Sequence, residues 1–301
     1  MVAAVLTTLL FSLSALSGRR LADHLPGPLA NLTRLLLATA VLGCCAHVLD
    51  AEMGGPAFAW LFVSGCVGFG VGDLALFQAY PRIGARRTMV LVQCLAAPIA
   101  ALTEWLWLGT VPGVMQALFG IVILSGVCVA LMPARGDTRP GHGLVAGTLF
   151  GMLAAAGQAW GAVLSRVAYA AAAERGLAIS GVGGGVNAAY QRLLGGLLVS
   201  VMFVLYLKIT RHAGSPARAA NWLRAWPMVI ANGLCGPVLG VSCYQWALSG
   251  APTGIVLPIV ATTPLVVMPF AHYLEGDRIT LRTLLGGLLA VAGVVGLTLA
   301  H

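Results

Sequence analysis

Long, uninterrupted apolar stretches dominate the chain, and most of its charged residues lie in the short segments between them. An α-helix needs about 20 mostly apolar residues to cross a hydrocarbon core of roughly 30 Å. Strands of a transmembrane barrel would instead alternate in hydrophobicity over segments of about ten residues. The pattern therefore predicts ten transmembrane helices, at residues 1–17, 28–48, 57–79, 86–108, 111–132, 142–169, 185–208, 225–249, 252–274 and 280–300.

The second half of the chain repeats part of the first at a constant offset of 167 residues, and matched positions include Gln78 with Gln245 and Gly126 with Gly293. Each repeat holds five predicted helices, an odd number, so the second repeat must enter the membrane from the opposite side. We therefore predict an all-α integral membrane fold of two inverted five-helix repeats, at residues 1–134 and 142–301, within one membrane domain. Inverted repeats are the usual construction of secondary transporters.

Composition supports the membrane assignment independently. Hydrophobic residues make up 59% of the chain, charged residues only 9%, and the mean hydropathy is +0.93, which is far from the values of soluble domains. No water-soluble core could bury that much apolar surface.

The basic residues are distributed unevenly over the two ends of the predicted helices. The opposite end has only Arg166 and Arg175, while the connections after helices 1, 3, 5, 7 and 9 carry Arg19, Arg20, Arg82, Arg86, Arg87, Arg135, Arg139, Lys208, Arg211, Arg218, Arg224, Arg278 and Arg282. The positive-inside rule then places these connections in the cytoplasm. Both termini are predicted on the non-cytoplasmic side of a cell inner (plasma) membrane. Because the charge is spread over short loops without a reading motif, no nucleic-acid partner is expected.

Several local features resemble a known family over essentially the whole chain. Each half has an arginine early in its second helix, Arg34 and Arg192, and the ninth helix contains Pro258 and Pro264 before a Glu-Gly end at Glu275. These features resemble the ten-helix EamA-like exporters of the drug/metabolite transporter superfamily. The resemblance implies alternating access of a small solute through a central cavity lined by helices 1, 3, 4, 6, 8 and 9. Pro258 and Pro264 are the preferred hinge positions, since prolines interrupt membrane helices.

Ionisable residues within the membrane are costly, by about 2.5 to 3.5 kcal/mol, and usually have a partner or a function. Arg34 and Asp73 both lie roughly 9 Å from the cytoplasmic end of their helices, given a rise of 1.5 Å per residue, so they could pair. Such a pair could form an inner gate or hold a substrate carboxylate, and the alternatives are a structural salt bridge or simple snorkelling to the interface. For Arg192, snorkelling to the interface and a substrate-facing role are both open. If transport is coupled to protons, Asp73 is the deep carboxylate available to titrate.

Polar and aromatic residues near the predicted midplane supply further candidates for substrate binding. The duplicated glutamines stand beside rings, and a mixed polar and aromatic surface suits a zwitterion with an apolar body, although packing or an interfacial belt is the alternative for each ring. The candidates are Gln78, Phe77, Gln245, Tyr244, Trp246, Gln158, Trp160 and Asn232. The duplication fails at Asp73, which corresponds to Gly240, and we expect distinctive chemistry where the symmetry is broken.

The sequence thus predicts a transporter, working as a monomer or a dimer, that exports a small neutral or zwitterionic metabolite of the amino-acid type. Phosphorylated solutes are disfavoured, because no Lys or Arg occurs between Ala225 and Asp277. No catalytic residue, metal site or cofactor is expected, since hydrolase, zinc and phosphate-binding motifs are all missing. The alternative is a membrane-embedded enzyme acting on lipid, with His47 and Asp50 as its acid/base pair.

Overall fold

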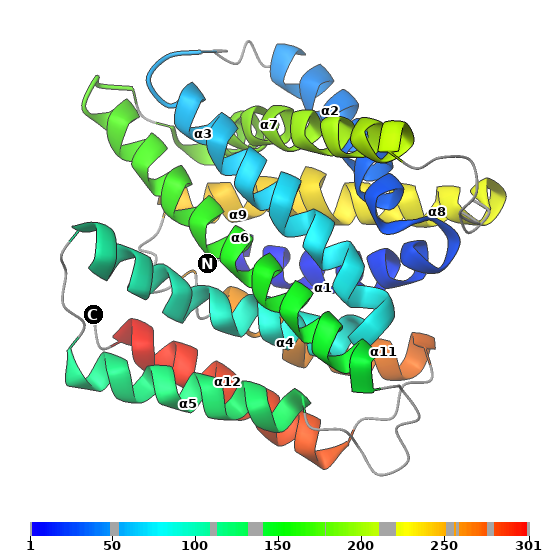
Figure 1. Cartoon of the computed structure of the whole chain (residues 1–301). Coiled ribbons are helices and arrows are strands. Elements are labelled where there is room, and N and C mark those ends of the chain that lie inside the picture. Colours follow the sequence, from blue (N-terminus) through cyan, green and yellow to red (C-terminus); the bar gives the residue numbers. More distant parts are fainter. Residues whose placement is uncertain are drawn as a thin grey trace.

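The computed structural model describes residues 2–48, 54–108, 113–131, 141–177, 179–210, 221–250, 256, 259–275 and 280–299. This part of the chain is helical almost throughout and contains no strand, which confirms the predicted all-α membrane class (Figure 1). The helices are α1 (Val2–His24), α2 (Gly27–Val48), α3 (Phe58–Gly65), η1 (Cys66–Gly72), α4 (Asp73–Leu108), α5 (Val114–Leu131), α6 (Gly141–Ala173), α7 (Gly181–Thr210), α8 (Trp222–Gly233), η2 (Leu234–Val238), α9 (Leu239–Gly250), α11 (Thr263–Glu275) and α12 (Leu281–Leu299).

Seven helical segments within the described residues are long and apolar enough to cross a membrane, and two shorter apolar helices accompany them. One of the seven, Phe58–Ala100, is 43 residues long, about twice the length of a single span. Its backbone leaves the helical region at Gly84, where φ is 80° and ψ is 164°, a conformation that favours glycine. The break lies between the predicted third and fourth helices, at 57–79 and 86–108. The total of ten helices stays a prediction.

Helices α5 and α12 pack side by side along one edge of the molecule (Figure 1). A Cβ atom added to Gly126 would meet the backbone of Ala290, and one added to Gly293 would meet Ile123. Helices α5 and α12 therefore run antiparallel here. Under the offset of 167, the contact of Gly126 with Ala290 becomes the contact of Gly293 with Ile123. This reciprocity, between antiparallel helices, is the pattern expected of an inverted duplication.

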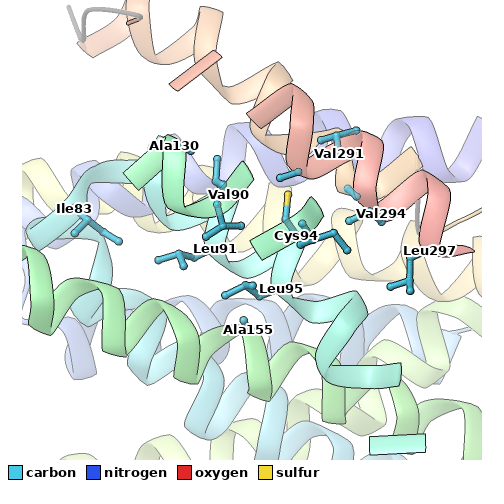
Figure 2. Packing of buried hydrophobic residues seen from close by; sticks show 14 of the residues in the cluster. Ile83, Val90, Leu91, Cys94, Leu95, Ala130, Ala155, Val291, Val294 and Leu297 are labelled. Carbon is cyan, nitrogen blue, oxygen red and sulfur yellow. The ribbon is translucent and has the colours of Figure 1, made fainter. Parts of the chain in front are cut away.

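The largest hydrophobic cluster joins this helix pair to the rest of the bundle (Figure 2). Val90 and Cys94 of α4 pack between α5 and α12, where they meet Ala130 and Val294. Ala155 extends the same cluster to α6. The α5 and α12 pair thus packs on α4, while the polar residues discussed below lie on α4 itself and on helices other than α5 and α12.

Two π-helical segments interrupt the α-helices at corresponding places in the two halves. They are η1, between α3 and α4, and η2, between α8 and α9. The offset of 167 places residues 67–71 of η1 on the whole of η2. Such segments often occur at functional sites. Their local sequences favour an interruption, because η1 is rich in glycine and η2 contains Pro237, which lacks a backbone N–H.

Candidate substrate-binding site

A central cavity lies beside both π-helical segments. Its walls include residues from α1, α2, α4, α6, α7 and α9 as well as η1 and η2. The aromatic part of the described lining is Phe11, Phe69, Tyr80 and Tyr244, and the polar part is Ser14, Arg34, Asp73, Gln93, Gln158 and Arg192. Two arginines and one aspartate give this lining a formal charge of +1. Arg34 on α2 and Arg192 on α7 therefore both reach the cavity. The resemblance, by contrast, implies walls from predicted helices 1, 3, 4, 6, 8 and 9, which do not include the second helix of either repeat.

Arg34 is fixed in this wall by several partners. Its side chain forms an ion pair with Asp73, at the start of α4, and its Nε donates to Asn31 Oδ1 at 3.0 Å. Nη1 donates to Asn232 Oδ1 at 3.3 Å, and the guanidinium carbon lies 5.0 Å from the centre of the Phe77 ring. With only 4% of the residue exposed, this charge is buried but compensated.

Asn232 links this group to the first helix. Its Nδ2 donates to the backbone oxygen of Ser14 at 2.6 Å and to Ser14 Oγ at 3.0 Å. The amide therefore connects α1, α2 and α8, and its oxygen orients Arg34. Asn232 lies outside the cavity lining and contacts two of its residues, Arg34 and Ser14.

Arg192 is equally buried but lacks this compensation. Only 7% of the residue is exposed, and its Nε has no hydrogen-bond partner. Its guanidinium carbon lies 5.2 Å from the centre of the Phe69 ring. Among the residues that the structure describes, no carboxylate lies within 4.0 Å of this guanidinium. A Cβ atom at Gly68 or Gly161 would lie 3.2 or 3.1 Å from Nη2, so glycine leaves room for the cation there.

A pair of amide side chains crosses the cavity wall between α4 and α6. Gln158 Nε2 donates to Gln93 Oε1 at 2.9 Å, and both residues line the cavity. The same two residues, with Tyr244, also line a second, smaller cavity that reaches Ala100 on α4. This second cavity is lined mainly by alanine and valine, and it lies along α4 on the side away from the break at Gly84.

The structure separates the candidate residues into three groups. Arg34, Asp73, Arg192, Gln158 and Tyr244 line the cavity, while Phe77 and Asn232 contact Arg34 from outside the lining. The remaining four candidates for substrate binding do not line it.

Each of these four side chains has another environment. Gln78 accepts a hydrogen bond from Arg82 Nη1 at 2.8 Å, one helical turn away, and fully buried Gln245 accepts one from Tyr169. Trp246 packs against a separate apolar cluster. Trp160 is 44% exposed and donates to Thr103 Oγ1 at 3.0 Å. Repetition of the glutamines reflects the scaffold, because neither duplicated amide reaches the cavity.

Of the two proposed hinge residues, the structure describes only Pro264. Pro264 is buried near the start of α11, directly after a turn at Thr262 that interrupts the preceding helical residues. Pro258 lies outside the described residues.

The acid/base pair of the enzyme alternative is described only in part. His47 packs on the edge of the Tyr190 ring and does not line the cavity. Asp50 lies outside the described residues.

Sequence reasoning missed Gln93, Asn31 and the rings Phe69 and Tyr80. Asn31 carried a usable signal, since it precedes Arg34 by three residues and so shares its helix face. The glycine-rich run at 65–72 also marked η1. Gln93 had no comparable signal, because only the packing of α4 on α6 brings it to Gln158. Within the described residues, no group of three or more Cys, His, Asp or Glu side chains could hold a metal.

Comparison with known sequences decides the family. The sequence model of the EamA-like transporter family matches residues 1–132 and 145–299. The chain belongs to the EamA-like transporter family. It is therefore a multi-pass membrane transporter of the drug/metabolite type, and members of the EamA-like family are transporters rather than enzymes. No curated protein matches the chain.

Solved structures agree with this fold. Fifteen solved chains match, and one of them, titled only "Crystal structure of protein", is 18% identical with a TM-score of 0.62. That alignment covers 99% of this chain and 96% of the other. At this identity the likeness shows only that the two chains share a fold.

Proposed function

We propose that this EamA-like transporter exports a small neutral or zwitterionic metabolite of the amino-acid type across a cell inner membrane. The observation that carries the proposal is the central cavity itself, whose described lining combines rings, two amides and three charges with a sum of +1. Apolar and aromatic walls with a few placed polar groups are typical of sites for small molecules. A solute with one carboxylate and an apolar body complements this lining.

The charges argue against phosphorylated solutes. Phosphate groups are commonly bound by several Lys or Arg side chains. Of the two arginines in the described lining, Arg34 is already paired with Asp73, so Arg192 alone remains available. A single such cation suits a single carboxylate better than a phosphate ester or a diphosphate.

Alternating access is supported by the relation between the two halves. The reciprocal contacts of Gly126 and Gly293 fit an inverted duplication, in which similar halves rock around a shared site. The cavity also touches η1 and η2, which occupy corresponding positions. We propose that these segments, together with the interruption before Pro264, absorb the bending as the halves rock.

The end of the cavity near Gly84 is closed by apolar side chains. Tyr80 and Met89 belong both to the lining and to a buried cluster that includes Leu21, Ala225 and Val267. This cluster joins α1, α2, α4, α8 and α11. With the orientation predicted from the basic loops, we propose that the cluster is a cytoplasmic gate and that the solute enters when these helices separate.

Transport into proteoliposomes tests the proposal. Purified protein is reconstituted, and each of the twenty standard amino acids is supplied in radiolabelled form. Saturable movement of at least one amino acid is expected, and none should move into protein-free vesicles. Chemical conversion of lipid without any solute movement would instead support the enzyme alternative. Repeating the assay under a pH gradient, with Asp73→Asn beside the wild type, tests proton coupling.

A further inference from the structure

We propose that Arg192 holds the carboxylate of the transported solute, so that the substrate takes the place that Asp73 fills beside Arg34. The inference rests on the proposed function and deepens it, because it assigns one end of the solute to one side chain. Three observations support it: the corresponding surroundings of the two arginines, the missing partner of Arg192, and its position in the cavity wall.

Arg34 and Arg192 lie 158 residues apart, so the offset of 167 does not pair them, but it does relate the residues that surround them. Arg192 lies over the ring of Phe69 in η1, and the residue 167 positions later is Gly236 in η2. A Cβ atom at Gly236 would lie 3.5 Å from Arg34 Nη1. Each arginine thus faces the π-helical segment of the other half. Likewise, Phe77 lies under Arg34, and its counterpart Tyr244 lines the same cavity as Arg192.

The polar partners of Arg34, by contrast, have no counterparts. Asp73 corresponds to Gly240, and Asn232 corresponds to Gly65. A Cβ atom at Gly65 would meet the backbone of Arg192, so no side chain fits there. At Gly240, a Cβ atom would lie 2.5 Å from the backbone oxygen of Cys235 and 2.8 Å from the Phe11 ring. Close packing has therefore excluded both partners on the Arg192 side.

A buried cation without a partner is costly, so its retention points to a ligand. Asp73 interacts with Arg192 over a longer range, but its ion pair is with Arg34. Nearby Tyr169 has a hydroxyl group, which donates to Gln245. The Nε hydrogen of Arg192 remains unused. A carboxylate in the cavity could accept from the guanidinium fork in the bidentate geometry that arginine favours.

The class of solute follows from this count of charges. A solute carboxylate would pair with Arg192, which, of the two arginines in the described lining, forms no ion pair. The amide of the same solute has no carboxylate and would leave this cation without an ion pair. The site should therefore distinguish an acid from the amide of the same shape, which is a difference that closely fitted hydrogen-bonding sites discriminate well.

Ligand-induced stabilisation tests this without requiring transport. The purified full-length protein is heated in detergent with small monocarboxylates and standard amino acids, each compared with its carboxamide. At saturating concentration, at least one acid should raise the melting temperature by about 2 to 4 °C, and its amide should not. Potassium chloride at the same ionic strength serves as the reference. Equal rises for acid and amide, for acid and chloride, or for none of the acids would overturn the proposal.

Two variants locate the effect. Arg192→Gln should lose the acid-dependent rise, whereas Arg175→Gln removes the same charge from an exposed position and should retain it. A full rise in a folded Arg192→Gln protein would also overturn the assignment. If Arg192→Gln does not fold, the comparison of acid with amide in the wild type still decides. Acid binding without transport would contradict only the proposed function, and transport of acid and amide alike would contradict only this inference.

Discussion

Arg34 and Arg192 each contact the π-helical segment of the other half of the transporter, yet of these two arginines only Arg34 forms an ion pair with a described carboxylate. Arg34 is bound to Asp73, Asn31 and Asn232, while Arg192 has the Phe69 ring and an unpartnered Nε. We therefore propose that Arg34 supports the scaffold and that Arg192 binds a ligand. Substitution of the two arginines should therefore have different effects on stability and on transport.

Breaking the buried ion pair should destabilise the protein. Arg34→Gln leaves Asp73 without its partner, and removal of one member of a buried pair costs about 3 to 5 kcal/mol. The double variant Arg34→Gln with Asp73→Asn should cost less than the sum of the two single variants, because no charge is then left alone. Unfolding in mixed detergent micelles measures all three. Additive losses would show that the two side chains do not stabilise each other.

The contact between α5 and α12 should not tolerate a methyl group at Gly126. Gly126→Ala is expected to destabilise the protein by about 1 to 3 kcal/mol, because the new Cβ would meet the backbone of Ala290. Gly120→Ala is the matched control in the same helix. No described atom lies within 4 Å of a Cβ there, and alanine favours helix over glycine by up to about 1 kcal/mol. Equal melting temperatures for the two variants would contradict the packing shown here.

The cavity assignment predicts different effects for two neighbouring residues of α6. Gln158→Leu removes the donor to Gln93 and places an apolar group in the wall, so the Michaelis constant for transport should rise at least several-fold. Trp160→Phe changes a half-exposed ring outside the lining and should leave transport unchanged. Initial rates in proteoliposomes compare the two. A large loss for Trp160→Phe alone would reverse the assignment.

The proposed orientation can be tested at two exposed positions. Leu223, which is 92% exposed, lies at the end predicted to face the cytoplasm, and exposed Glu174 lies at the opposite end. Each is changed to cysteine in a chain whose seven native cysteines have been replaced. A membrane-impermeant thiol reagent added to intact cells should label Glu174→Cys and not Leu223→Cys. The reverse result would invert the predicted topology.

The sequence predicted the fold class well because membrane helices are specified by long apolar stretches that need no knowledge of neighbours. It also indicated that Arg34 and Asp73 could meet, since both lie at similar depths. It could not show that Gln78 would bind Arg82 while Gln93 would reach the cavity, because that depends on how each helix is rotated in the bundle. The π-helical segments likewise depend on backbone packing that hydropathy does not record.

The most direct test of the account is saturable uptake of radiolabelled amino acids by proteoliposomes that contain the wild type, Arg192→Gln or Arg175→Gln. We predict that at least one amino acid enters wild-type and Arg175→Gln vesicles, and that Arg192→Gln lowers the ratio of kcat to KM at least tenfold, which corresponds to about 1.4 kcal/mol. If no amino acid enters wild-type vesicles, the proposed export function is contradicted. If Arg192→Gln transports as well as the wild type, the carboxylate does not bind at Arg192.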